Sequence, residues 1–122
     1  MGKPLSEQEL HNLAMNIVGR ELEAQGYEFM GVNSKLKKNP QFVCLKDKTL
    51  HFIVVRHVGY PGNPRSYDAT FMKKMKDHAL AHEGRIYYAG VGLSNAKDKN
   101  LPVYLNEDYM VEYDGLIEVY DV

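Results

Sequence analysis

The stretch QFVCLKDKTLHFIVVR, residues 41–56, contains two extended segments that a two-residue turn joins. Residues 41–46 and 49–58 are rich in β-branched and aromatic side chains, which are favoured in strands. Asp47 and Lys48 form a connection of hairpin length, although it lacks the glycine that is usual there. The centre of the second segment, FIVV, is apolar at every position, which is typical of a strand covered on both faces. We therefore predict an antiparallel hairpin at the centre of a sheet.

Regular elements are predicted on both sides of this hairpin. Ser6 and Glu9 fit a capping box, and apolar residues then recur at three- and four-residue steps until Gly26. The elements predicted around the hairpin are a helix over 6–25, a strand over 27–32, a helix over 69–83 and a strand over 85–93. Gly90 and Gly92 lie inside the last strand, which predicts that another backbone packs closely against it.

The order of these elements predicts a mixed sheet. A helix inserted between the strands at 49–58 and 85–93 makes a right-handed crossover, so these two strands are expected to be parallel neighbours. The fold class is therefore α+β, with one helix on each side of the sheet, in a single domain whose core spans 6–93. A β-rich extension follows over 101–122. Its predicted parts are short strands at 102–105 and about 109–113, a turn at Asp114–Gly115 and a final extended stretch.

Composition excludes several classes of function. Fifteen Lys and Arg against sixteen Asp and Glu give a net charge of −1, which excludes a uniformly basic nucleic-acid binder but not a local basic patch. Cys44 is the single cysteine, which excludes an internal disulfide, a four-thiolate zinc site and a self-contained iron–sulfur cluster. No apolar run approaches the roughly 20 residues of a membrane span, and the N-terminus lacks a signal-type apolar segment. We expect a cytoplasmic protein without a membrane span and without a cofactor.

The αβββαβ order, the hairpin segment 41–56 and the sequence LEAQGY at 22–27 resemble the core of the restriction-endonuclease-like superfamily. The small Holliday-junction-resolvase-like and YraN-like members are the most similar, and the resemblance covers about residues 6–93. Active members carry an acid on the second strand and an acid-x-Lys pair on the third. Two carboxylates on adjacent strands hold Mg²⁺ there, and the lysine shares their face.

The resemblance implies that this active site is degenerate. Gln41 stands at the position of the first acid, Val54 at the position of the second and Arg56 at the position of the lysine. A neutral amide and a valine cannot hold a hard dication, and an arginine cannot act as a base. We therefore expect no catalytic residues and no metal ligands at these three positions.

Two interpretations of this vestigial cleft remain open. In the first, Arg56 binds a phosphate or carboxylate group in a cleft that Gln41 and Val54 also line. In the second, Arg56 emerges at the end of the strand and pairs with a surface acid. Lysines also mark the first turn, at Lys35, Lys37 and Lys38, and other basic side chains lie further along the chain. They either converge on a nucleic-acid backbone or form an ordinary solvated surface. The residues that we name as nucleic-acid contacts are Lys46, Lys48, Arg65 and Lys73.

Three further features have alternative interpretations. His78 and His82 lie four residues apart on the second predicted helix, as in a two-histidine metal site or a half-exposed helix surface. Cys44 lies beside no obvious general base, so we expect a buried structural thiol. The extension 101–122 is rich in tyrosine, which suits either an exposed sheet edge or a homodimer interface.

Three hypotheses for function follow. The leading one is a non-catalytic binding or protein-interaction module on a degenerate nuclease-like fold. The second is a divergent metal-dependent nuclease or nucleic-acid-binding protein, which would recruit Glu28, Asp47 or Asp68 around Arg56. The third comes from small chains similar to this one that carry the name of the electron-input component of the Na⁺-translocating NADH:quinone reductase. With one cysteine and a single small domain, that resemblance implies an accessory protein without a redox cofactor of its own.

Overall fold

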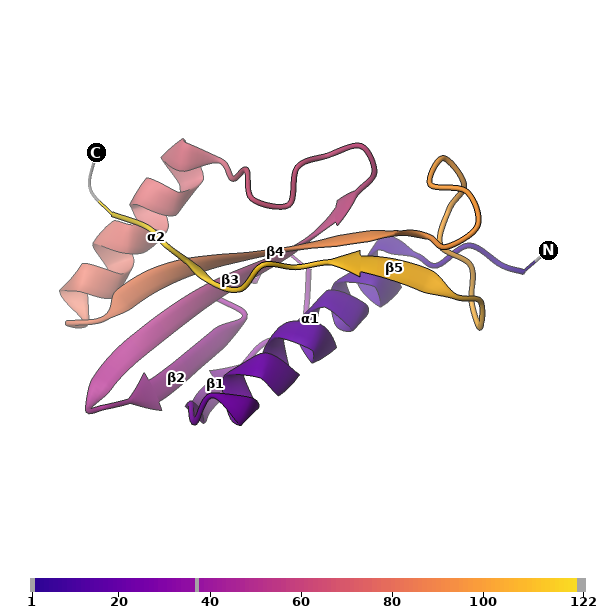
Figure 1. The fold of residues 1–122 in the computed structure, drawn as a ribbon. Coiled ribbons are helices and arrows are strands. Elements are labelled where there is room, and N and C mark those ends of the chain that lie inside the picture. The colour runs from indigo at the N-terminus through magenta and orange to yellow at the C-terminus, as the bar shows by residue number, and fades with distance from the viewer. Residues whose placement is uncertain (1, 37, 121–122) are drawn as a thin grey trace.

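The computed structural model describes residues 2–36 and 38–120 (Figure 1). Two helices and six strands make up the fold. In chain order they are α1 (Glu7–Ala24), β1 (Glu28–Val32), β2 (Phe42–Lys46), β3 (Thr49–Gly59), α2 (Ala69–Ala81), β4 (Arg85–Asn95), β5 (Tyr109–Glu112) and β6 (Ile117–Glu118). The Ser6 capping box is present at the start of α1, as predicted.

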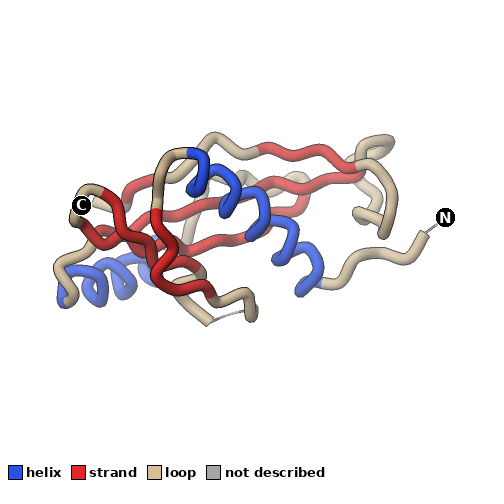
Figure 2. Tube along the Cα trace, turned by 90° about the horizontal axis from the view of Figure 1, so that it is seen from below, coloured by secondary structure: helices blue, strands red, loops and turns tan. Residues whose placement is uncertain are grey.

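The strands form one mixed sheet. Their order is β1-β2-β3-β4-β5, and β6 pairs with β4 beyond the end of β5. The first three strands are antiparallel neighbours, β3 and β4 are parallel, and β5 is antiparallel to β4. α2 lies on one face of the sheet, and α1 runs across the opposite face (Figures 1 and 2). The predicted mixed sheet, the parallel pair and the helix on each side are therefore confirmed.

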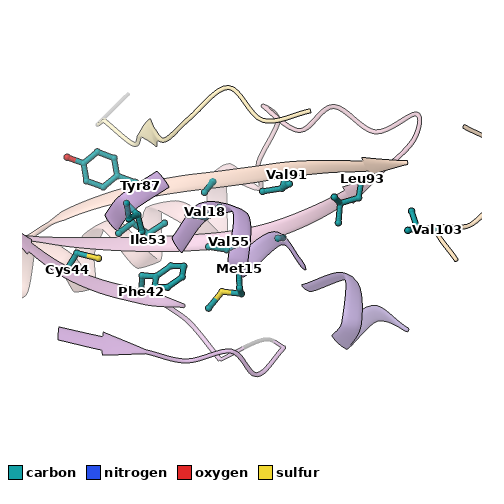
Figure 3. Packing of buried hydrophobic residues seen from close by; sticks show 13 residues of the cluster. Met15, Val18, Phe42, Cys44, Ile53, Val55, Tyr87, Val91, Leu93 and Val103 are labelled. Atoms are coloured by element: carbon teal, nitrogen blue, oxygen red, sulfur yellow. The ribbon is translucent and has the colours of Figure 1, made fainter. Parts of the chain in front are cut away.

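β3 buries side chains toward both helices. Ile53 and Val55 pack in a cluster with Val18 of α1 (Figure 3). Val54 points the other way and packs with Met72 of α2. Because successive side chains of a strand alternate between its faces, an apolar run was needed to fill both layers. This burial confirms the prediction of a central strand.

The turn between β2 and β3 forms without glycine. Asp47 and Lys48 both adopt left-handed backbone conformations, with φ of 51° and 63°. Two such residues match the twist of the flanking strands, and aspartate tolerates this conformation better than most residues. The predicted hairpin is thus confirmed.

The close approach predicted at Gly90 is also present. A Cβ atom at Gly90 would overlap the carbonyl oxygen of Pro64, in the loop between β3 and α2. At Gly92 a Cβ atom would lie 2.9 Å from Cγ of Pro64 and 3.1 Å from Cβ of Glu112. The two glycines therefore let the loop and β5 lie directly against β4.

The prediction of a strand at 102–105 is wrong. Tyr104 forms an isolated bridge with Pro4 in place of a strand, and the segment is held by bonds from the Leu5 amide to the Val103 carbonyl and from the Leu105 amide to the Lys3 carbonyl. Pro102 has no amide to donate, which limits regular pairing here. The strand expected at 109–113 is present as β5, and the final extended stretch is present as β6. Residues 121–122 of that stretch lie outside the described residues.

Neither described helix is long and apolar enough to cross a membrane.

Candidate functional site

Gln41 lies where β2 begins to pair with β3, and it is fully buried. Its main-chain amide donates to the Ile53 carbonyl over 3.0 Å, and its main-chain carbonyl accepts from the Asn33 amide over 2.8 Å. Pro40 precedes it and has no amide, so the strand ladder ends there. The side-chain oxygen of Gln41 then accepts from the Val55 amide over 2.7 Å. The side chain thus replaces the ladder bond that the main chain does not supply.

Arg56 lies half-buried on β3 and contacts the side-chain amide of Gln41. Its Nη1 donates to Oε1 of Gln41 over 3.4 Å and to the Val55 carbonyl over 2.8 Å. Its Nη2 donates to Oδ1 of Asn39 over 2.9 Å. The guanidinium carbon lies 5.4 Å from the centre of the Phe71 ring in α2, within reach of a cation–π contact. Arg56 therefore links β3, the segment before β2 and α2.

The hydrogen-bond partners of the charged Arg56 guanidinium are neutral amide and carbonyl oxygens. Burial lowers the pKa of Arg56, and the nearby Tyr88 acts in the opposite direction. Among residues 2–36 and 38–120, no carboxylate forms an ion pair with Arg56. The interpretation that Arg56 pairs with a surface acid is therefore wrong for this part of the chain, because amide and carbonyl oxygens lie nearer to the guanidinium.

Of the three positions that the family resemblance singles out, the structure brings two together. Gln41 and Arg56 are in contact, whereas Val54 is fully buried in the layer beneath α2. Asn39, which the sequence analysis did not single out as a site residue, joins them, because its Oδ1 also accepts from Nε2 of Gln41 over 2.9 Å. Its position directly before Pro40 was the available signal, since a proline that ends a ladder leaves polar groups for a neighbouring side chain to satisfy.

The acids proposed for a recruited nuclease site have other positions. Asp68 caps α2 and accepts from the Phe71 amide over 3.0 Å. Glu28 lies exposed on the edge strand β1, and Asp47 lies in the β2–β3 turn. None of the three forms an ion pair with Arg56 in the described structure.

The four proposed nucleic-acid contacts are spread over the sheet and α2. Lys46 and Lys48 lie at the β2–β3 turn, where the Lys46 ammonium is 4.7 Å from the centre of the Tyr27 ring. Arg65 follows the opposite end of β3 and pairs with Asp114 over 3.6 Å. Lys73 is exposed on α2. A strand the length of β3 spans roughly 35 Å, so the turn lysines and Arg65 cannot grip one phosphate. Lys37 lies outside the described residues.

His78 of α2 and His82, which caps the end of this helix, form a pair of neighbouring rings at the surface. Their ring centres are 4.8 Å apart, and both rings lie near the Phe52 ring, at 6.1 and 6.2 Å. Among the described residues, no three His, Cys, Asp or Glu side chains come together as they would around a metal ion. Contact with Phe52 is an ordinary packing role for this pair.

Cys44 is fully buried in β2. Burial raises the pKa of its thiol to about 11. The thiol therefore stays protonated at neutral pH and is a poor nucleophile, as a structural thiol is.

Buried histidines lie on the face of the sheet that α1 covers. His11 of α1 is 1% exposed, and no group in the described structure bonds its Nε2. Nδ1 of His51 lies 3.1 Å from the hydroxyl of Tyr87. Burial lowers the pKa of His11, His51 and His57. These imidazoles are therefore neutral when the protein is folded at neutral pH.

We expect the protein to lose stability as the pH falls below about 6.5, the pKa of an unperturbed histidine. The unfolded chain takes up protons on these imidazoles at a higher pH than the folded chain does, so protonation favours unfolding. Urea unfolding at about pH 7.5 and about pH 5.5 measures the loss. The variant His11→Phe keeps an aromatic ring but removes the titrating nitrogens, so its loss should be smaller. An equal loss in both proteins would contradict the contribution assigned to His11.

One family matches most of the chain. Residues 8–119 match the family described as a domain of unknown function, DUF8840. The chain belongs to this family. The match reaches from the first turn of α1 past the end of β6, so it includes the whole sheet and the Arg56 cluster. The chain matches none of the curated proteins and none of the solved structures.

Proposed function

We propose that the protein is a non-catalytic binding or protein-interaction module on a degenerate restriction-endonuclease-like core. The order αβββαβ, the β2–β3 hairpin and the helix between the parallel strands β3 and β4 support this assignment. They are the features on which the resemblance to that superfamily depends.

The contact between Gln41 and Arg56 carries the proposal. Active members of the superfamily have metal-binding carboxylates and a lysine at the corresponding positions. In this protein an amide and a guanidinium bond each other and Asn39, and Val54 fills the core. Mg²⁺ prefers carboxylate oxygens in a near-octahedral arrangement, and a closed amide–guanidinium cluster supplies none. The hydrogen bonds among Asn39, Gln41 and Arg56 instead fix the segment before β2 to β3.

A cleavage assay tests this proposal. We expect no Mg²⁺- or Mn²⁺-dependent cleavage of supercoiled DNA, single-stranded DNA or RNA by the parent protein, because the described residues place no carboxylate pair at the cluster. Arg56→Ala and the matched variant Arg20→Ala, at an exposed position of α1, should be equally inactive. Metal-dependent cleavage that Arg56→Ala abolishes and Arg20→Ala retains would overturn the proposal in favour of a divergent nuclease.

Binding of nucleic acid without cleavage is the alternative favoured by the exposed Lys48 at the hairpin and the exposed Lys73 on α2. Fluorescence anisotropy of labelled DNA and RNA at about 0.05 and 0.3 M salt tests it, because phosphate contacts weaken as salt rises. One double variant replaces Lys46 and Lys48, at the β2–β3 turn, and another replaces Arg65 and Lys73, after β3 and on α2. The double variant with the weaker binding would show which of the two regions contacts the nucleic acid. Absence of any salt-sensitive binding removes this alternative.

An accessory role beside a Na⁺-translocating NADH:quinone reductase stays a prediction of the sequence resemblance. An absorbance spectrum of the purified protein tests the part of it that concerns cofactors. A flavin spectrum would contradict the expectation of a protein without its own redox group.

A further inference from the structure

The outer edge of β5 has main-chain groups that no described strand pairs. Among the described strands, β5 pairs with β4 alone, and just before β5 the Asp108 carbonyl accepts from the Ala96 amide over 3.4 Å. In an antiparallel ladder, the amide and carbonyl of one residue point to the same side, and successive residues alternate. The main-chain amides and carbonyls of Asp108, Met110 and Glu112 therefore face β4. The main-chain amides and carbonyls of Tyr109 and Val111 face outward.

This edge is also apolar and exposed. Tyr109, Met110 and Val111 are 38%, 54% and 44% exposed, although all three are residues that strands usually bury in part. β5 ends the strand order of the sheet, and Figure 1 shows it running alongside β4. An exposed apolar edge with unpaired amides is a template for another strand.

The charges around β5 disfavour a second copy of the chain. Residues 107–114 contain four acids and no lysine or arginine. Pairing two copies of β5 about Met110 would place Glu112 of one opposite Asp108 of the other. Pairing about Val111 would place Asp108 opposite Asp114. Like charges directly opposite each other destabilise a pair of strands, so a homodimer, one of the two alternatives for the tyrosine-rich extension, is disfavoured in these two registers.

The same acids favour a cationic strand. Alternation from the register with β4 places Asp108 and Glu112 on the α2 face of the sheet, since Glu112 lies opposite Gly92 and Leu93 belongs to the α1 face. Basic side chains of an added strand on that face would lie beside these carboxylates. Arg65 pairs with Asp114, but Asp108 and Glu112 form no ion pair with a described residue.

The α1 face next to β5 is suited to apolar side chains. Tyr109 and Val111 project on this face. A hollow of about 390 Å³ lies between α1 and the segment before β5. Leu5, Leu13, Leu105 and Tyr109 form the apolar part of its wall, and Glu9, Glu107 and three asparagines form the polar part. In strand addition, main-chain bonds supply affinity and hollows for alternate side chains supply specificity.

We infer that the outer edge of β5 captures an extended cationic segment of another protein by strand addition. The segment alternates apolar side chains on the α1 face with lysine or arginine on the α2 face. This inference deepens the proposed function, because it rests on the protein being a binding module and names the surface and the partner.

A short labelled peptide of alternating valine and lysine tests the inference by fluorescence anisotropy. We expect saturable binding that weakens with salt, and no comparable binding of a peptide of alternating valine and glutamate. Val111→Pro removes an outward amide without removing a bond to β4, so it should weaken binding at least about tenfold and leave the fold intact. The double charge reversal Asp108→Lys with Glu112→Lys should weaken binding similarly and shift the preference toward the glutamate peptide. Met30→Lys, on the opposite edge strand, serves as the matched control and should bind as the parent does.

Three outcomes would overturn the inference: failure of the parent to bind the lysine peptide, equal binding by Val111→Pro, or a dimer in sedimentation analysis that Val111→Pro converts to a monomer. The last outcome would mean that a second copy covers the edge. Metal-dependent cleavage of nucleic acid would defeat the proposed function without affecting peptide binding, so the two failures are distinguishable.

Discussion

Replacing Gly90 with alanine is expected to lower the free energy of unfolding by about 3 kcal/mol or more, at the upper end of overpacking effects. The added Cβ would overlap the carbonyl oxygen of Pro64 and lie 2.9 Å from its carbonyl carbon and 2.8 Å from Cε2 of Tyr88. The first two atoms belong to backbone, which cannot move aside as a flexible side chain does. β4 cannot easily move away from Pro64, because it pairs with β3 at Gly90 and its neighbours Ala89 and Val91 are buried in the core on the opposite face.

Gly59 is the matched control for this prediction. It lies at the end of β3, and a Cβ there would meet no atom within 4 Å. Gly59→Ala should therefore leave the free energy of unfolding unchanged or raise it slightly, because alanine reduces the entropy of the unfolded chain. Urea unfolding of the two variants and the parent measures the difference. Similar stabilities of Gly90→Ala and Gly59→Ala would contradict the role given to Pro64.

The elements that were predictable from the sequence are those that local chemistry specifies. The apolar run in β3 required cover on both faces, and Gly90 indicated close backbone packing because glycine otherwise weakens a strand. The error at 102–105 has a different origin. Tyr104 bridges to Pro4, about a hundred positions earlier in the chain, and no local pattern indicates such a partner. Strand propensity depends on neighbours of this kind, so it failed where the neighbour was distant.

The candidate site was predictable in part for the same reason. The family resemblance aligned Gln41 and Arg56 with the superfamily's acid and lysine positions, and the structure places these two side chains in contact. The partner of the guanidinium was not predictable, because a surface acid and a buried amide are both common choices. The third member, Asn39, was missed because its role depends on the position of Arg56, seventeen residues later. The unpaired edge of β5 likewise became visible only with the strand order.

The second large effect is expected from Gln41→Leu, which should lower the free energy of unfolding by at least about 3 kcal/mol. Leucine has nearly the same volume but bonds neither the Val55 amide nor the Lys38 carbonyl, which Gln41 contacts over 2.7 and 3.1 Å. Each buried polar group that loses its partner costs about 1–3 kcal/mol, and a charged group costs more. The Arg56 guanidinium loses an acceptor in the same substitution.

Gln8→Leu tests whether this loss comes from burial and not from the residue type. Gln8 also joins two segments, since it donates to the Ser34 carbonyl over 2.8 Å and accepts from the Leu36 amide over 3.2 Å. It is only half-buried, however, so water can replace the lost partners and the expected change is below about 1 kcal/mol. Urea unfolding compares the two variants directly. If Gln41→Leu lowered the free energy of unfolding as little as Gln8→Leu, the Gln41 side chain would not fix the segment before β2 to β3. The contact between Gln41 and Arg56 would then be free to open for an anionic ligand.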